Sequence, residues 1–125
     1  MNLLLDTHVL LWWLEDNPVL SEKARGAIAR GRNVVFVSAA TAWEIAIKKR
    51  LGKLQAPDNL EEVIAANRFE PLPISIAHAL AVAELPQHHR DPFDRMLVAQ
   101  AKAENLTLVT RDELITECDI PLLQA

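Results

Sequence analysis

Short apolar runs alternate with segments of helical periodicity along the chain, and this alternation restricts the possible folds more than any other feature. Apolar and β-branched runs indicate buried strands at 2–5, 34–37, 106–110 and 120–123, with a short or edge strand in the proline-containing segment 69–74. Helical patterns cover about 6–15, 21–30, 38–51, 58–68, 75–85 and 91–105, and a short helix is expected from Asp112. This order predicts an α/β fold, a three-layer α/β/α sandwich around a mostly parallel sheet.

Capping signals indicate where several of these helices begin. Ser38 is a favourable N-cap for the third helix, and Asp58 with Glu61 forms a capping-box-like start for the fourth. The strongest signal is Asp91 followed by Pro92, because aspartate is favoured at the N-cap and proline at the first helical position.

The length of 125 residues suits one domain with a hydrophobic core, and we expect a single domain over residues 1–125. The longest apolar stretch, 9–14, is far too short to cross a bilayer, and the first residues lack the basic start of a signal peptide. Cys118 is the only cysteine, so no intramolecular disulfide can form. These features predict a cytoplasmic protein that does not enter the membrane.

The formal net charge of −4 argues against broad, sequence-independent binding of nucleic acid, which depends on excess lysine and arginine. A local basic cluster at 48–53 is expected to be a solvated helix face. His8 and His78 fall within helical segments, where packing or surface roles are expected of them.

Asp94 stands where a solvent-exposed acid is not expected. At about 100° per residue, it falls within the arc that Leu97, Val98 and Ala101 form on the helix beginning after Asp91. Position N3 would let Asp94 bond backbone N–H groups, but that role does not explain its place among apolar residues. We therefore assign the capping role to Asp91 and treat Asp94 as a candidate site residue.

Three further acids, Asp6, Glu44 and Asp112, follow or flank apolar runs. Because ligands bind outside the carboxyl ends of parallel strands, these acids are expected at the same edge of the sheet. Each also has a simpler possible role: Asp6 and Asp112 as helix N-caps, and Glu44 as the i,i+4 partner of Lys48. Thr110 is placed to donate its hydroxyl to a neighbouring carboxylate or to a bound water.

Carboxylates that gather in a low-dielectric cleft repel one another unless protons or a cation compensate. Mg²⁺ or Mn²⁺ suits such a site, because both prefer oxygen ligands. No Cys/His spacing suits zinc, the adjacent pair His88–His89 is expected to be a loop feature, and the three isolated glycines form no phosphate-binding loop. The predicted metal ligands are Asp6, Glu44, Asp94 and Asp112.

Four segments of the chain match a known pattern, and they span nearly its whole length. The segments are LLLDTH at 3–8, WEIAIK at 43–48, RDPFDR at 90–95 and LVTRD at 108–112. Together they resemble the PIN-domain ribonucleases of the VapC toxin type. The segment at 90–95, continued by MLVAQA, is the most specific of the four.

The resemblance implies a PIN-like sandwich in which Asp6, Glu44 and Asp94 match the core acids of the family. Asp112 matches a more variable fourth acid, and Thr110 matches the hydroxyl residue beside it. The implied activity is Mg²⁺- or Mn²⁺-dependent cleavage of RNA, usually a structured RNA such as tRNA or rRNA. A homodimer and a cognate antitoxin protein are also implied.

Within that picture we expect Asp6 and Asp94 to bind the principal metal directly. Glu44 and Asp112 would hold it through water or bind a second ion. Arg95 would either contact a phosphate or pair with a neighbouring acid.

Two alternatives come from other classes of protein. A phosphoacceptor receiver domain also gathers acids at strand ends, but paired acids after the first strand and a lysine ending a late strand are missing here. A non-catalytic interaction protein on the same scaffold would use Trp12, Trp13 and Trp43 as a partner groove, although core packing is the commoner role of such residues.

Overall fold

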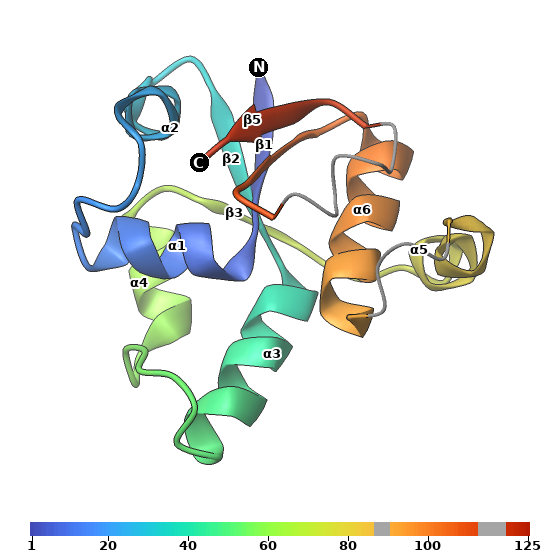
Figure 1. Ribbon diagram of the computed structural model, residues 1–125, viewed down its shortest axis with the longest axis horizontal. Coiled ribbons are helices and arrows are strands. Elements are labelled where there is room, and N and C mark those ends of the chain that lie inside the picture. Colours follow the sequence, from blue (N-terminus) through green and yellow to red (C-terminus); the bar gives the residue numbers. More distant parts are fainter. Residues whose placement is uncertain (87–90, 113–119) are drawn as a thin grey trace.

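The computed structural model describes residues 1–86, 91–112 and 120–125, and the strands within these ranges form one parallel sheet (Figure 1). The sheet order is β3-β2-β1-β4-β5, and each neighbouring pair is parallel. The strands are β1 Asn2–Leu5, β2 Val34–Ser38, β3 Glu70–Leu72, β4 Thr107–Thr110 and β5 Leu122–Gln124. The predicted parallel sheet is therefore confirmed. The short strand β3 lies at an edge of the sheet, as expected of a strand that contains a proline. Pro71 has no backbone N–H, and at an edge its missing hydrogen bond does not interrupt the sheet.

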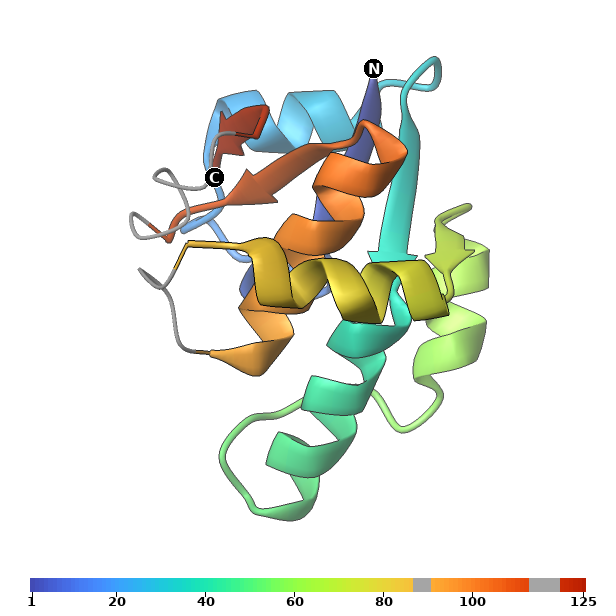
Figure 2. The same cartoon turned by 90° about the vertical axis from the view of Figure 1, so that its right-hand side faces the viewer.

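Helices cover both faces of the sheet, which confirms the predicted three-layer arrangement. The helices are α1 Thr7–Leu14, α2 Glu22–Ala29, α3 Ala39–Arg50, α4 Leu60–Ala66, α5 Ile76–Ala81 and α6 Pro92–Glu104, with a 3₁₀ turn η1 at Val82–Glu84. In Figure 1, α1, α2 and α4 lie on one side of the sheet and α5 and α6 on the other. Figure 2 shows α5 lying over α6. None of the helices in the described ranges is long and apolar enough to cross a membrane.

Strand β1 divides the hydrophobic core into two layers. Leu3 and Leu5 are fully buried in the cluster that includes residues of α1, α2 and α4. Leu4, between them in sequence, is buried in the cluster that includes residues of α6. This alternation follows from the period of two in a strand, and it leaves the polar residues after the strand at the sheet edge.

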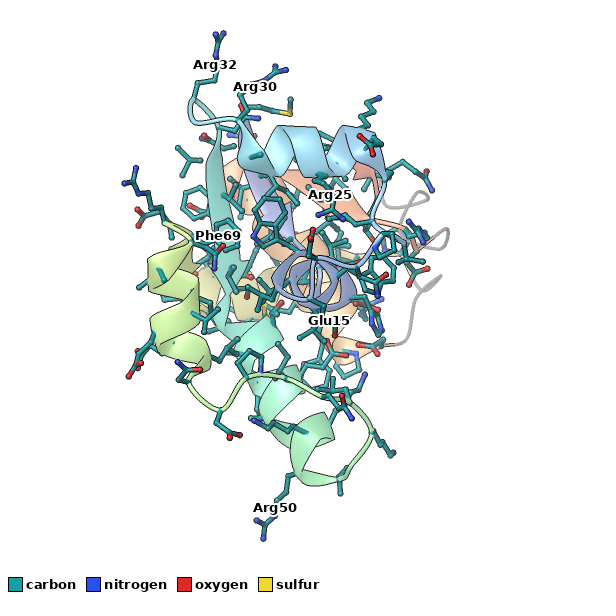
Figure 3. All side chains as sticks on the ribbon, turned by 90° about the vertical axis from the view of Figure 1, so that its left-hand side faces the viewer. Glu15, Arg25, Arg30, Arg32, Arg50 and Phe69 are labelled. Atoms are coloured by element: carbon teal, nitrogen blue, oxygen red, sulfur yellow. The ribbon has the colours of Figure 1, made fainter. Side chains whose placement is uncertain are left out.

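Figure 3 looks onto the first of these layers, with Phe69 beside α4. On the same face, Arg25 of α2 donates to Asp16, just past the end of α1, at 2.9 Å. Helices α1 and α2 are thus linked at their surface as well as through the core.

Two of the predicted caps are present and one is wrong. The Ser38 hydroxyl accepts from the backbone N–H of Ala40, and the Asp91 carboxylate accepts from the first turn of α6. The expected cap at Asp58 is absent, because α4 begins after Asn59 without a side-chain cap and Asp58 instead pairs with Lys49 on α3. The short helix expected from Asp112 and the pair at 88–89 lie outside the described residues.

The strand order distinguishes this fold from a receiver domain. A receiver-like doubly wound sheet has the order 2-1-3-4-5, whereas the order here is 3-2-1-4-5. The receiver alternative is therefore excluded by topology.

We expect Ser38→Ala to lower the free energy of unfolding by about 2–3 kcal/mol. Ser38 caps α3 and also donates to Oε1 of Gln100 on α6 at 2.5 Å, and both side chains are fully buried. The variant loses a cap and leaves a buried acceptor unpaired. Urea denaturation followed by circular dichroism measures the change.

Ser21→Ala is the matched control. Ser21 caps α2 through the N–H of Ala24 at 3.1 Å, and its other bond, to the carbonyl of Gln124, is exposed. Because water can replace the exposed bond to Gln124, the loss of the cap dominates, and a decrease of about 1 kcal/mol is expected. Equal losses in the two variants would contradict the importance of the Ser38–Gln100 bond.

Candidate functional site

A pocket of about 250 Å³ opens at the carboxyl ends of β1 and β4, and acids from four parts of the chain line it. The four predicted site acids are all among its lining residues, together with one more acid: Asp6, Glu44, Asp91, Asp94 and Asp112. The sheet register explains part of this convergence, since Leu5 pairs with Val109 and the next residues on each strand are therefore neighbours. The short links from β1 into α1 and from β2 into α3 bring in Asp6 and Glu44, and the start of α6 brings in Asp91 and Asp94.

Asp6 is both a helix cap and a buried pocket acid. Its Oδ1 accepts from the backbone N–H of Val9 at 2.9 Å, as an N-cap does, and its Oδ2 accepts from the Thr110 hydroxyl at 2.5 Å. This is one of the two contacts expected of Thr110. Burial raises the pKa of the Asp6 carboxyl, although the bonds from Thr110 and Val9 act in the opposite direction.

Glu44 is held from two sides in a buried position. Only 4% of it is exposed, and its carboxylate accepts from the Thr7 hydroxyl at 2.5 Å and from the Lys48 ammonium one turn along α3. Both interpretations considered for Glu44, a helix-surface pair and an inward-facing acid, therefore describe the same side chain. The hydrogen bond to Glu44 raises the pKa of Lys48, whose charge is thus held firmly at neutral pH.

The position of Lys48 corrects one expectation. A solvated helix face was predicted for the basic cluster at 48–53, but Lys48 turns into the acidic pocket. Its neighbour Lys49 pairs instead with the exposed acid Asp58, outside this pocket. The sequence signal was the i,i+4 spacing of Glu44 and Lys48. Because Glu44 is buried, its partner Lys48 also turns toward the pocket.

Asp91 and Asp94 both line the pocket from the start of α6. Asp91 Oδ1 accepts from the N–H groups of Phe93 at 2.9 Å and Asp94 at 3.1 Å, so it is the N-cap as predicted. Its second role, as a residue of the pocket wall, was not predicted, because the capping role alone explained the presence of Asp91 at this position. Asp94 is half-buried there, consistent with its position in the apolar arc of the helix.

Asp112 and Arg95 complete the predicted set. The backbone N–H of Asp112 donates to the Thr110 hydroxyl at 3.0 Å, which places this residue at the pocket beside Thr110 and Asp6. Arg95 donates to the carbonyls of Val82 and Pro86, each at 2.8 Å. These contacts fasten η1 and the segment after it to α6, a structural role that was not predicted for Arg95.

Five pocket residues besides Asp91 were not identified as site residues from the sequence. They are Thr7, His8, Trp12, Lys48 and Arg111. His8 had been expected in a packing or surface role, and it is an exposed residue at the pocket. For His8 and Trp12 the sequence did offer a signal, because the two rings are four residues apart on the helix that follows Asp6.

The donor chemistry of the pocket fits a hard divalent cation. All five acids offer carboxylate oxygens, the ligands that Mg²⁺ and Mn²⁺ prefer, and the raised pKa of Asp6 marks a buried carboxyl whose ionised form a cation would stabilise. In the side-chain arrangement of the described residues, no three His, Cys, Asp or Glu groups already stand together as a metal site. Lys48 currently supplies the positive charge at Glu44.

Comparisons with known proteins agree with this geometry. The family model of the PIN domain matches residues 3–120. Ribonuclease VapC16 of Mycobacterium tuberculosis is 39% identical over 59 residues, a stretch that covers 46% of this chain and 42% of that protein. The chain thus matches less than half the length of this curated relative.

Solved structures extend the similarity over the whole fold. VapBC2 from Rickettsia felis, bound to a DNA fragment from its promoter, superposes with a TM-score of 0.74 at 18% identity, over 99% of this chain and 98% of that chain. DNA-bound VapBC from Salmonella typhimurium gives a TM-score of 0.69 at 18% identity, with the same coverage. These similarities confirm the PIN-like fold and, with the family model, the resemblance to VapC-type proteins.

Proposed function

The chain belongs to the PIN domain family, and from that premise we propose that it is a metal-dependent endoribonuclease, the toxin of a toxin–antitoxin pair. The observation that carries the proposal is the convergence of Asp6, Glu44, Asp94 and Asp112 on one pocket at the carboxyl edge of the sheet. The ribonuclease name of the partial relative VapC16 supports the same reaction class.

In the proposed site, Asp6 and Asp94 bind the metal, and Glu44 and Asp112 hold it through water or bind a second ion. A bound Mg²⁺ or Mn²⁺ would supply an activated water and offset negative charge at phosphorus. The Thr110 hydroxyl orients Asp6 through its 2.5 Å bond, and the Thr7 hydroxyl orients Glu44 in the same way. These bonds fix the carboxylates before substrate arrives, which reduces the reorganisation needed during reaction.

The substrate we propose is RNA, tRNA or rRNA in particular, and the proposed setting is the cytoplasm. A cognate antitoxin that blocks the site and a second copy of the chain are the proposed partners. Support for the antitoxin comes from the solved structures of similar fold, which are described as VapBC complexes. The proposed functional unit is the single domain over residues 1–125.

Incubation of the purified protein with total cellular RNA tests the proposal. We expect discrete RNA fragments in the presence of Mn²⁺ or Mg²⁺ and none in the presence of EDTA, because without a cation no activated water is supplied and the five pocket acids repel the phosphate backbone. Gel electrophoresis and sequencing of fragment ends measure the result.

Restoring Mn²⁺ after EDTA treatment is the control, and cleavage should return. Equal cleavage with and without EDTA would contradict the metal mechanism. Intact RNA in every condition would favour the non-catalytic interaction protein.

A further inference from the structure

Two ring contacts join three side chains at the pocket, and none of the three is used in the proposed chemistry. His8 and Trp12 lie one turn apart on α1, with ring centroids 5.9 Å apart and planes inclined by 30°. The Arg111 guanidinium carbon lies 4.7 Å from the centroid of the Trp12 ring. All three line the same pocket as the acids.

The Arg111 guanidinium is fixed by the backbone. It donates to the carbonyl of Ala125 at 2.6 Å and to the carbonyl of Val19. A guanidinium held in this way keeps its plane beside the Trp12 ring without further loss of rotamer freedom. Such an arrangement combines a cation–π contact with a fixed positive charge.

The electrostatics of the pocket require an attractive contact for RNA. Five carboxylates line the pocket, and they repel phosphate. Of the lysine and arginine residues in its described lining, Lys48 is paired with Glu44, which leaves Arg111 as the cation next to an aromatic surface. The arginines labelled Arg30, Arg32 and Arg50 in Figure 3 point away from the body of the protein.

We propose that His8, Trp12 and Arg111 form a stacking platform for an unpaired RNA base beside the scissile phosphate. Unpaired bases stack on aromatic rings and guanidinium planes, and every base offers the π-face that such stacking needs. His8 is exposed and lies against the Trp12 ring, so a base can stack on its imidazole. The inference rests on the proposed ribonuclease function and specifies its substrate as RNA with a single-stranded target position.

Packing alone accounts for only part of this arrangement. Trp12 is half-buried and packs against the core cluster on one side, which a purely structural residue would also do. His8 is exposed and adds little burial, yet it lies against the Trp12 ring at the pocket. The platform is therefore tested by binding rather than by stability.

The experiment uses the full chain carrying Asp94→Asn, so that RNA is bound without being cut. A fluorescein-labelled adenosine octaribonucleotide is titrated, and anisotropy gives Kd. We expect His8→Ala to weaken binding about 5- to 150-fold, because the base stacks on the exposed imidazole and stacking on an aromatic ring contributes about 1–3 kcal/mol per base. Trp12→Leu, which removes the ring behind the imidazole, should weaken binding by a smaller factor, and Trp12→Phe should restore most of that loss.

Trp13→Phe is the matched control. Trp13 lies next in sequence, but it donates to Asn67 at 3.0 Å and packs near Phe69, away from the pocket. Affinity for the octamer should stay within about twofold of the Asp94→Asn parent. An octamer of abasic ribose phosphate should bind the parent and the Trp12→Leu variant equally weakly.

Two results would overturn the platform: unchanged Kd in both Trp12→Leu and His8→Ala, or equal binding of the abasic and adenosine octamers. Circular dichroism of each variant shows whether it has folded, and His8→Ala, at an exposed position, keeps the test open if Trp12→Leu does not fold. If wild-type protein cleaves RNA while these affinities are unchanged, only the platform fails. If wild-type protein cleaves no RNA, the proposed function fails whatever the octamer affinities are.

Discussion

Asp6→Asn will lower the rate of RNA cleavage in Mg²⁺ roughly 10²- to 10⁴-fold while the protein stays folded. The amide removes a direct charged ligand, and the metal contributes several kcal/mol to stabilising charge at phosphorus, with each 1.36 kcal/mol worth a factor of ten. Asparagine keeps the oxygen that accepts from the Val9 N–H at 2.9 Å, so α1 still has its cap. Single-turnover cleavage of a defined RNA measures the rate.

Asp16→Asn provides the matched control. Asp16 is an exposed acid that pairs with Arg25, and its φ of 52° lies in the left-handed region that asparagine tolerates well. Cleavage by this variant should equal that of the wild type. The assignment of Asp6 as a ligand fails if Asp6→Asn retains activity within a few-fold of the wild type.

Asp6→Asn should also change the free energy of unfolding when metal is absent. Burial raises the pKa of the Asp6 carboxyl above its ordinary value of 3.8. A raised pKa in the folded state stabilises the fold below the unfolded pKa, and this stabilisation is lost as pH rises through the folded value. Wild-type protein therefore carries the cost of a buried carboxylate at pH 7, and Asp6→Asn does not.

We thus expect Asp6→Asn to be at least as stable as wild type at pH 7 in EDTA, with the difference shrinking as pH falls toward 4. Urea denaturation at both pH values measures it. If Asp6→Asn lowers the free energy of unfolding by several kcal/mol at pH 7, Asp6 acts mainly as a buried cap. In that case its burial and its repulsion by other acids do not destabilise the wild type.

Local patterns were enough to predict the layers of this fold. The apolar runs of β1, β2 and β4 and the start signal at Asp91–Pro92 depend on neighbours within a few residues, and the structure has them where they were predicted. The cap at Asp58 failed because a long-range partner decided it: Lys49, nine residues earlier, pairs with that carboxylate. The capping propensity of residues within one segment cannot predict an ion pair with a residue on another helix.

The candidate site shows the same division between local and long-range information. The strand-end rule brought Asp6, Glu44 and Asp112 to one edge from the order of the elements alone. The partners of these acids were harder to predict, because the bond from Thr7 to Glu44 joins residues 37 apart in sequence and Thr7 has no signal of its own. Asp91 was missed for another reason: one satisfied role, the helix cap, concealed a second.

Lys48→Met will make the stability of the fold depend on divalent cations. Removing the ammonium leaves Glu44, which is 4% exposed, with the Thr7 hydroxyl and without its positive partner. Breaking a fully buried pair costs about 3–5 kcal/mol, but the Lys48 side chain is 34% exposed and solvent screens it, so we expect a loss of about 1–2 kcal/mol in EDTA. Thermal unfolding should show a fall in Tm of roughly 3–10 °C.

Saturating Mg²⁺ should then raise the Tm of Lys48→Met more than that of the wild type, because the ion replaces the missing charge near Glu44 and binds only the folded state. Lys49→Met is the control: the neighbouring lysine also forms an ion pair, but with the exposed carboxylate of Asp58, outside the acidic pocket. Its Tm should change little, with or without Mg²⁺. Equal gains from Mg²⁺ in both variants would mean that the cation does not bind beside Glu44, and the metal site would then have to be built around Asp6 and Asp94 alone.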